Sequence, residues 1–293
     1  MAQIKKAHHD LRKSRALLIR SGLRPRKRLG QHFLEDPAAI KAIISRAQFK
    51  PTDVVVEIGP GLGALTIPTL PHIHHLVGIE KDPPLVKLLW EKLTAEQQQK
   101  VTLVSEDVLR LNFRQIKDTF RQKLRVFGNL PYNISAPFLE LLIENRIYLR
   151  NAILMFQYEV ARRLTAAPNT KEYGALSVVF QYYARISPLL KIERTSFYPK
   201  PNVDSMVLEF DFDKPHPHRA QNDEWLMRVV RAAFGFRRKT ILNSLRRSMA
   251  PANRDMIACA LEKAAIDPKR RAETLTIDEY IRLSTFLLSD TSS

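Results

Sequence analysis

Short apolar segments alternate with segments of helical periodicity over the first two thirds of the chain. A helix is expected from Asp36, where an N-capping residue and Pro37 precede apolar residues at helical spacing. Apolar runs predict strands at 54–58, 76–79, 101–104, 124–127 and 152–156, with helices near 62–70, 83–98, 135–147 and 159–165 and later strands at 178–186 and 206–212. Strands that alternate with helices form a parallel sheet covered on both faces. The pattern therefore predicts an α/β fold.

The pattern changes near residue 214. Lys214–His218 contains two prolines and is expected to be a turn-rich linker, and the pattern over 222–289 is helical without a good strand. We therefore predict an α/β domain over 29–214 and a smaller all-α domain over 215–293.

Charge separates the two ends of the chain from its middle. The 293 residues carry a net charge of +17, of which residues 1–28 contribute +9 and residues 219–271 contribute +8, so that the rest is neutral. Two cationic ends on a neutral body favour the binding of a polyanion. The simpler alternative is a solvated surface with a basic tail. Residues 1–28 show little periodicity, and we predict a flexible tail there.

Composition excludes several other classes of protein. No run of 18 uncharged apolar residues is present, so no transmembrane helix is expected, and the N-terminus lacks the apolar run of a secretory signal. The single Cys259 excludes an internal disulfide and a cysteine-based zinc site. We interpret His72–His75 as a surface turn, and no metal site is expected. A cytoplasmic protein is predicted.

Chemically distinctive residues follow the first three predicted strands. The first is followed by a Gly-x-Gly-x-Gly loop that includes Gly59 and Gly61, where backbone can approach a ligand closely. Glu80 ends the second strand and suits ribose hydroxyls, and Asp107 follows the third, where it can accept from an adenine amino group. Each feature alone has a structural explanation. Together, at the edge where open α/β sheets bind ligands, they predict an adenosine-containing cofactor.

The fourth strand ends in Asn129-Leu130-Pro131-Tyr132. The side-chain carbonyl of Asn129 and the backbone carbonyl of Leu130 can both accept from an exocyclic amine, and Tyr132 can stack on a planar ring. Pro131 completes this candidate catalytic set. The alternative is a strand ended by proline next to a core tyrosine.

With these motifs in view, the chain resembles the KsgA-type ribosomal RNA adenine dimethyltransferases, which are class I S-adenosylmethionine-dependent methyltransferases with a Rossmann-like sheet. The resemblance covers roughly residues 24–285 and rests on segments 26–34, 57–63, 129–135, 171–177, 197–205 and 237–240, with Glu80 and Asp107. It implies cofactor contacts at His32, Leu34, Gly59, Gly61, Glu80, Asp107 and Asn129. It also implies that Asn129, Leu130 and Tyr132 hold a target adenine, with Phe197 stacked on its other face. Three departures from the family pattern are His32, where many relatives have Asn, Ala175, which replaces a frequent Arg, and Phe234-Gly235-Phe236, which precedes Arg237.

The resemblance implies methylation of two adjacent adenosines in a loop near the 3′ end of 16S rRNA during maturation of the small ribosomal subunit. The helical C-terminal domain would bind RNA phosphates through Arg237, Arg238, Lys239, Arg246 and Arg247. The expected partner is 16S rRNA or an immature small subunit, without membrane contact and with the protein as a monomer. Alternatives are a resistance-type 23S rRNA dimethyltransferase, a DNA adenine methyltransferase, an NAD(P)-dependent oxidoreductase and a non-catalytic assembly factor.

Overall fold

The computed structural model describes residues 13–131, 134–236, 238–249 and 254–289. Contacts between residues divide the chain into two units, each described separately below. The first unit combines the chain up to Ala161 with Ser187–Asp213, and the second combines Arg162–Ile186 with the chain from Lys214 onward. The segment 162–186 thus belongs with the C-terminal helices, although its place in the sequence suggests the α/β domain.

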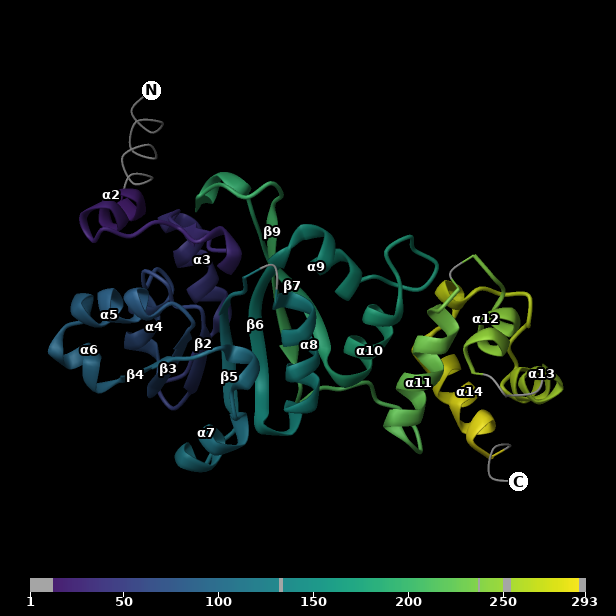
Figure 1. Cartoon of the computed structure of the whole chain (residues 1–293). Coiled ribbons are helices and arrows are strands. Elements are labelled where there is room, and N and C mark those ends of the chain that lie inside the picture. Colours follow the sequence, from purple (N-terminus) through teal and green to yellow (C-terminus); the bar gives the residue numbers. More distant parts are fainter. Residues whose placement is uncertain (1–12, 132–133, 237, 250–253, 290–293) are drawn as a thin grey trace. The chain divides into compact units, whose positions relative to one another are not determined.

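A mostly parallel sheet of seven strands forms the centre of the first unit, with the order β4-β3-β2-β5-β6-β9-β7 (Figure 1). Strands β2 to β6 pair in parallel, and β9 runs antiparallel to β6. The strands are β2 (Val54–Ile58), β3 (His75–Glu80), β4 (Val101–Ser105), β5 (Leu124–Asn129), β6 (Leu149–Gln157), β7 (Arg185–Ile192) and β9 (Ser205–Asp211). The predicted α/β class with a Rossmann-like sheet is confirmed.

Helices connect these strands, and their sequence signals explain where they begin. In α3, Asp36 accepts a hydrogen bond from the Ala38 backbone nitrogen and Pro37 occupies the first turn. The predicted helix over 83–98 is two helices, because Thr94 forms a capping box with Gln97 and starts a new helix. The helices are α3 (Pro37–Ala47), α4 (Thr66–Thr69), α5 (Pro83–Lys92), α6 (Ala95–Gln99), α7 (Phe113–Phe120), α8 (Ser135–Glu144) and α9 (Tyr158–Leu164).

The chain passes from β2 outward to β4 and then returns to β5 on the other side of β2. Ligands of open α/β sheets bind outside the carboxyl ends of the strands at this point of reversal. Gly128 permits the close approach of the two central strands there. Its φ is +150°, and an added Cβ would lie 2.4 Å from the backbone oxygen of Ile58.

The structure corrects the prediction of a flexible tail over residues 1–28. Residues 1–12 lie outside the described part, but Lys13–Arg20 form helix α2. Leu18 is buried, with 2% of its surface exposed, in a cluster with Phe33, Leu62 and Leu85 of the sheet unit. The apolar face of this eight-residue helix is hard to recognise from the sequence, because basic residues surround it.

The predicted strand over 178–186 is also wrong over its first six residues, 178–183. Residues Ala175–Tyr183 form helix α10, and β7 begins only at Arg185. The apolar run fits either structure by composition. Its helical form buries Val178, Phe180 and Tyr182.

The second unit is helical among the described residues, apart from the first residues of β7. Besides α10 it contains α11 (Asp223–Phe234), α12 (Ile241–Ser248), α13 (Arg254–Lys263) and α14 (Ile277–Ser289). Tyr173 joins the inserted segment to these helices, because its hydroxyl donates to the Leu275 carbonyl and its ring contacts Phe234. In the part of the chain that the structure describes, no helix has both the length and the apolar composition needed to cross a bilayer.

Candidate active site

One pocket of the sheet unit lies where the carboxyl ends of β2, β3 and β5 meet. The predicted cofactor contacts all line it, namely His32, Leu34, Gly59, Gly61, Glu80, Asp107 and Asn129. Leu130 and Pro131 line it as well. The sequence prediction that these strand ends converge is therefore correct in geometry.

Glu80 is hydrogen-bonded to the backbone of the glycine loop. Its Oε2 accepts from the Gly61 backbone nitrogen at 3.1 Å, and its Oε1 accepts from the Asp82 nitrogen at 3.0 Å. Burial of the side chain raises the pKa of Glu80 above its ordinary value. A carboxylate oxygen can accept more than one hydrogen bond, so lone pairs remain for hydroxyl groups of a ligand.

Asp107 is ionised at the rim of the pocket. Lys81 Nζ lies 2.6 Å from Asp107 Oδ2, and the Leu109 backbone nitrogen donates to Oδ1 at 3.1 Å. The hydrogen bond from Lys81 holds the pKa of this carboxyl below its usual range. Asp107 is thus a permanent acceptor at neutral pH.

Asn129 is oriented by the N-terminal segment. Its Nδ2 donates to the His32 carbonyl at 2.9 Å, which orients the amide and leaves Oδ1 to act as an acceptor. His32 is held in turn, because its Nδ1 lies 2.6 Å from the Pro199 carbonyl. The contact of His32 with Asn129 is made by the backbone of His32, so it does not depend on which side chain stands at this position.

Glu57 is a pocket residue that sequence reasoning did not assign. Only 1% of its surface is exposed, and its Oε2 has no hydrogen-bond partner among the described residues. Burial raises the pKa of Glu57 to about 8, so its carboxyl is largely protonated at neutral pH. A lone charged residue in the apolar strand 54–58 was the available signal. Gln31, Lys81 and Glu106 also line the pocket without having been predicted.

The structure does not bring Phe197 to this pocket. Strand β8 (Phe197–Tyr198) pairs with β1 (Phe33–Leu34), and the alternation of side chains turns Phe197 into the core, where 3% of it is exposed. Stacking of Phe197 on an adenine stays a prediction that requires the ring to leave this core. Tyr132 lies outside the described residues.

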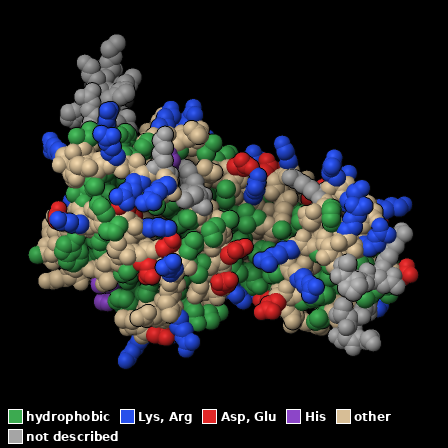
Figure 2. Space-filling model, viewed as in Figure 1, with side chains coloured by type: hydrophobic (Ala, Val, Ile, Leu, Met, Phe, Trp, Pro, Cys, Tyr) green, Lys and Arg blue, Asp and Glu red, His purple; other side chains and the backbone are tan. Residues whose placement is uncertain are grey.

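The predicted RNA contacts lie in the helical unit. Arg238 and Lys239 are exposed in the turn before α12, and Arg246 and Arg247 are exposed in its last turn. The Arg247 guanidinium lies 5.5 Å from the ring centre of Phe236, whose exposed fraction is 41%. Figure 2 shows basic side chains gathered over this part of the unit. Arg237 lies outside the described residues.

Comparison with known proteins agrees with this geometry. The family model described as ribosomal RNA adenine dimethylase matches residues 22–287. A ribosomal RNA small subunit methyltransferase A from Desulforapulum autotrophicum is 44% identical over 274 residues, which cover 93% of this chain and 95% of the relative. A protein of the same name from Moorella thermoacetica is 42% identical, with 92% and 94% covered.

Solved structures share the fold. A dimethyladenosine transferase from Plasmodium falciparum aligns with a TM-score of 0.71 at 24% identity over 86% of this chain and 95% of the other. The 23S rRNA methyltransferase ErmE aligns with a TM-score of 0.67 at 25% identity over 87% and 99%. Identity is much higher to the small-subunit enzymes, which disfavours the resistance-type alternative. The resemblance seen in the motifs is confirmed: the chain belongs to the ribosomal RNA adenine dimethylase family.

Proposed function

We propose that this protein transfers methyl groups from S-adenosylmethionine to N6 of two adjacent adenosines in small-subunit rRNA. The observation that supports the proposal most is the position of Asn129, whose oriented amide borders the same pocket as the glycine loop, Glu80 and Asp107. Methyl transfer to an exocyclic amine needs both a nucleoside cofactor and an acceptor for the amine at one place.

The pocket fits S-adenosylmethionine by the chemistry of its groups. Glu80 and Asp107 offer acceptors for ribose hydroxyls and the adenine amino group, and Leu62, Ile79 and Val108 offer apolar surface. Gly59 has a φ of +66°, and an added Cβ would meet only the Asn129 carbonyl, so the backbone leaves room for a ligand. Glu57 Oε2, which has no hydrogen-bond partner among the described residues, can accept from a cationic amino group, and the positive charge of that group would favour the ionised carboxylate.

The residues of the chain act chiefly by positioning the target adenine relative to the methyl group of the cofactor. S-adenosylmethionine supplies an electrophilic methyl group on a positively charged sulfur. Asn129 Oδ1 and the Leu130 carbonyl accept the two N6 hydrogens of the target adenine, which favours a pyramidal nitrogen whose lone pair is less delocalised into the ring. The hydrogen bond from Asn129 Nδ2 to His32 keeps the acceptor in place during this step. The nitrogen gives up its proton to water after transfer.

The target base must leave its stack to reach a pocket of this kind. The exposed cations around α12 would hold phosphates of a folded RNA, so that recognition depends on shape and charge, with a loop adenine splayed out. The proposed substrate is 16S rRNA within an immature small subunit, and the protein would act as a monomer in the cytoplasm, where subunits mature.

The proposal is tested by methyl transfer from labelled S-adenosylmethionine to undermethylated small subunits, with large-subunit rRNA and DNA as competing substrates. Label recovered as N6,N6-dimethyladenosine in small-subunit rRNA alone is the expected result. Label in large-subunit rRNA would favour the 23S activity, and cofactor binding without any transfer would favour a non-catalytic assembly factor.

A further inference from the structure

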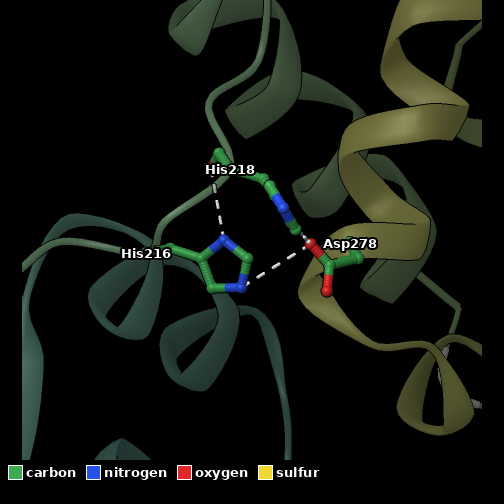
Figure 3. A group of neighbouring side chains, drawn as sticks. All are labelled: His216, His218 and Asp278. Atoms are coloured by element: carbon green, nitrogen blue, oxygen red, sulfur yellow. Dashed lines mark hydrogen bonds and ion pairs between the residues drawn. The ribbon is translucent and has the colours of Figure 1, made fainter.

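We propose that His216, His218 and Asp278 form a binding site for one divalent transition-metal ion of the zinc class. The two histidines lie in the segment between β9 and α11, and Asp278 lies in the first turn of α14, sixty residues further along the chain. The three side chains converge, as Figure 3 shows, and all belong to the helical unit. Their ligand atoms lie within 4.8 Å of one another.

The two imidazoles approach the same oxygen. His218 Nδ1 lies 2.7 Å from Asp278 Oδ1, and His216 Nε2 lies 3.8 Å from that atom. Two imidazole nitrogens and one carboxylate oxygen are the ligand types of many zinc sites with an open fourth position. The His218 side chain is 71% exposed, so solvent and metal ions can reach the site.

The hydrogen bonding of His216 supports a cation at this place. Its Nδ1 lies 3.2 Å from the His218 carbonyl, which can only accept, so the ring proton is on Nδ1. In the neutral ring Nε2 then presents a lone pair toward a carboxylate oxygen. Two acceptors that face each other at 3.8 Å attract a cation between them. A ring nitrogen that donates to a backbone carbonyl is also the usual support of a metal-bound histidine.

Among the residues that the structure describes, no lysine or arginine neutralises the charge of Asp278. Among the described residues, no lysine or arginine forms an ion pair with Asp278, whose partners are the two histidines. The nearby Arg219 pairs with Asp223 at 2.6 Å and lies over the Tyr182 ring. The negative charge is therefore available to a bound ion.

Metal binding needs only a small rearrangement. Ligands at about 2.1 Å from zinc lie about 3.4 Å apart in a tetrahedron, so His218 and Asp278 must separate slightly while His216 moves closer. His218 must carry its proton on Nε2, and exposure lets its ring adjust. A bound ion would tie the segment 214–220 to α14 and so stabilise the helical unit.

The test is titration of the full, untagged, metal-free protein with Co²⁺ and Zn²⁺. We expect one tight equivalent of Co²⁺, with the visible absorption of a low-coordinate ion, displaced by Zn²⁺. His216→Ala and Asp278→Asn should each weaken Zn²⁺ binding at least tenfold, by analogy with the loss of supporting groups around zinc. Zn²⁺ should raise the melting temperature of the wild type and leave that of His218→Ala unchanged.

His74→Ala is the matched control, because His74 is an exposed histidine of the sheet unit. It should bind Zn²⁺ as the wild type does. The proposal is overturned if the wild type binds neither ion tightly, or if His216→Ala and Asp278→Asn bind as tightly as the wild type. In that case the cluster is a hydrogen-bonded contact in which a proton on His216 takes the place of the ion. Methyl transfer is not needed for either readout.

Discussion

At the scale of single residues, Glu57 has the most unusual environment in the pocket. Its carboxyl is buried in an apolar strand beside Glu80, and its pKa rises from 4.5 to about 8. Between these two pH values the folded protein holds a proton that the unfolded chain has lost. Stability therefore falls as pH rises through this window.

We predict that Glu57→Gln removes this dependence. At pH 8 the variant should be more stable than the wild type, by on the order of 4 kcal/mol as an upper figure, because the wild type then has to bury a charge or bind a proton. At pH 4 the two proteins should differ little. Denaturant unfolding of both proteins without cofactor, at intervals from pH 4 to pH 9, measures the difference. Parallel curves for the two proteins would show that Glu57 is ionised in the folded state.

At the scale of elements, helix α2 supports the pocket from outside. Leu18 is buried against Phe33, Leu62 and Leu85, and these three residues line the pocket. Arg26 and Gln31 anchor the segment that follows α2, because both contact the buried carboxylate of Asp82 at 3.1 and 3.0 Å. Occupancy of the pocket and attachment of α2 should therefore be coupled.

Leu18→Ala should weaken binding of S-adenosylhomocysteine about tenfold. The substitution removes packing of the size that costs about 2–5 kcal/mol in a core, which is enough to loosen a short helix. Calorimetric titration measures the affinity, and limited proteolysis near residue 20 reports attachment. Ile19→Ala is the control, because 64% of Ile19 is exposed, and it should bind as the wild type does. Equal affinities of the two variants for S-adenosylhomocysteine would show that packing of α2 does not affect binding in the pocket.

Gly128→Ala tests the junction of the central strands. The added Cβ would lie 2.4 Å from the Ile58 carbonyl, and the φ of +150° is unfavourable for alanine. We expect loss of several kcal/mol of stability or failure to fold. Gly174→Ala, whose Cβ meets nothing within 4 Å, should melt close to the wild type. A stable Gly128→Ala protein would contradict the strand spacing described here.

Some of these elements could be predicted from the sequence and others could not. The convergence of Gly59, Glu80 and Asn129 follows from topology alone, because parallel strands place their carboxyl ends at one edge. The burial of Phe197 depends on which face of a two-residue strand meets the core, and short pairings leave no periodic signal. The grouping of Tyr173 with Leu275 and of His218 with Asp278 rests on contacts far apart in sequence. Local patterns contain no information on such pairs.

At the scale of the whole molecule, the proposed RNA-binding cations and the proposed cofactor pocket belong to different units. The exposed cations around α12 belong to the helical unit, whereas the pocket belongs to the sheet unit. Substitutions among the cations around α12 should therefore leave cofactor binding in the pocket intact, and substitutions in the pocket should leave RNA binding intact.

Replacement of both Arg246 and Arg247 by Gln should weaken binding of small-subunit rRNA and reduce the slope of log affinity against log salt by about 1 to 2. Affinity for S-adenosylhomocysteine should not change. A Lys41→Gln/Lys87→Gln protein removes the same charge from exposed positions of the sheet unit and should keep most RNA affinity. An equal effect of the two double substitutions would show that net charge, and not this surface, determines binding.

The most direct test of the account follows N6-methyladenosine and N6,N6-dimethyladenosine over time in small-subunit rRNA, with wild type and Asn129→Ala under saturating S-adenosylmethionine. The wild type should convert adenosine to the dimethylated form. Asn129→Ala should be slower by about a hundredfold or more, since it loses an acceptor aimed at the reacting amine. Asn112→Ala, which removes the cap of α7, should lose some stability and keep its rate. Rapid dimethylation by Asn129→Ala would contradict the central role given to this residue.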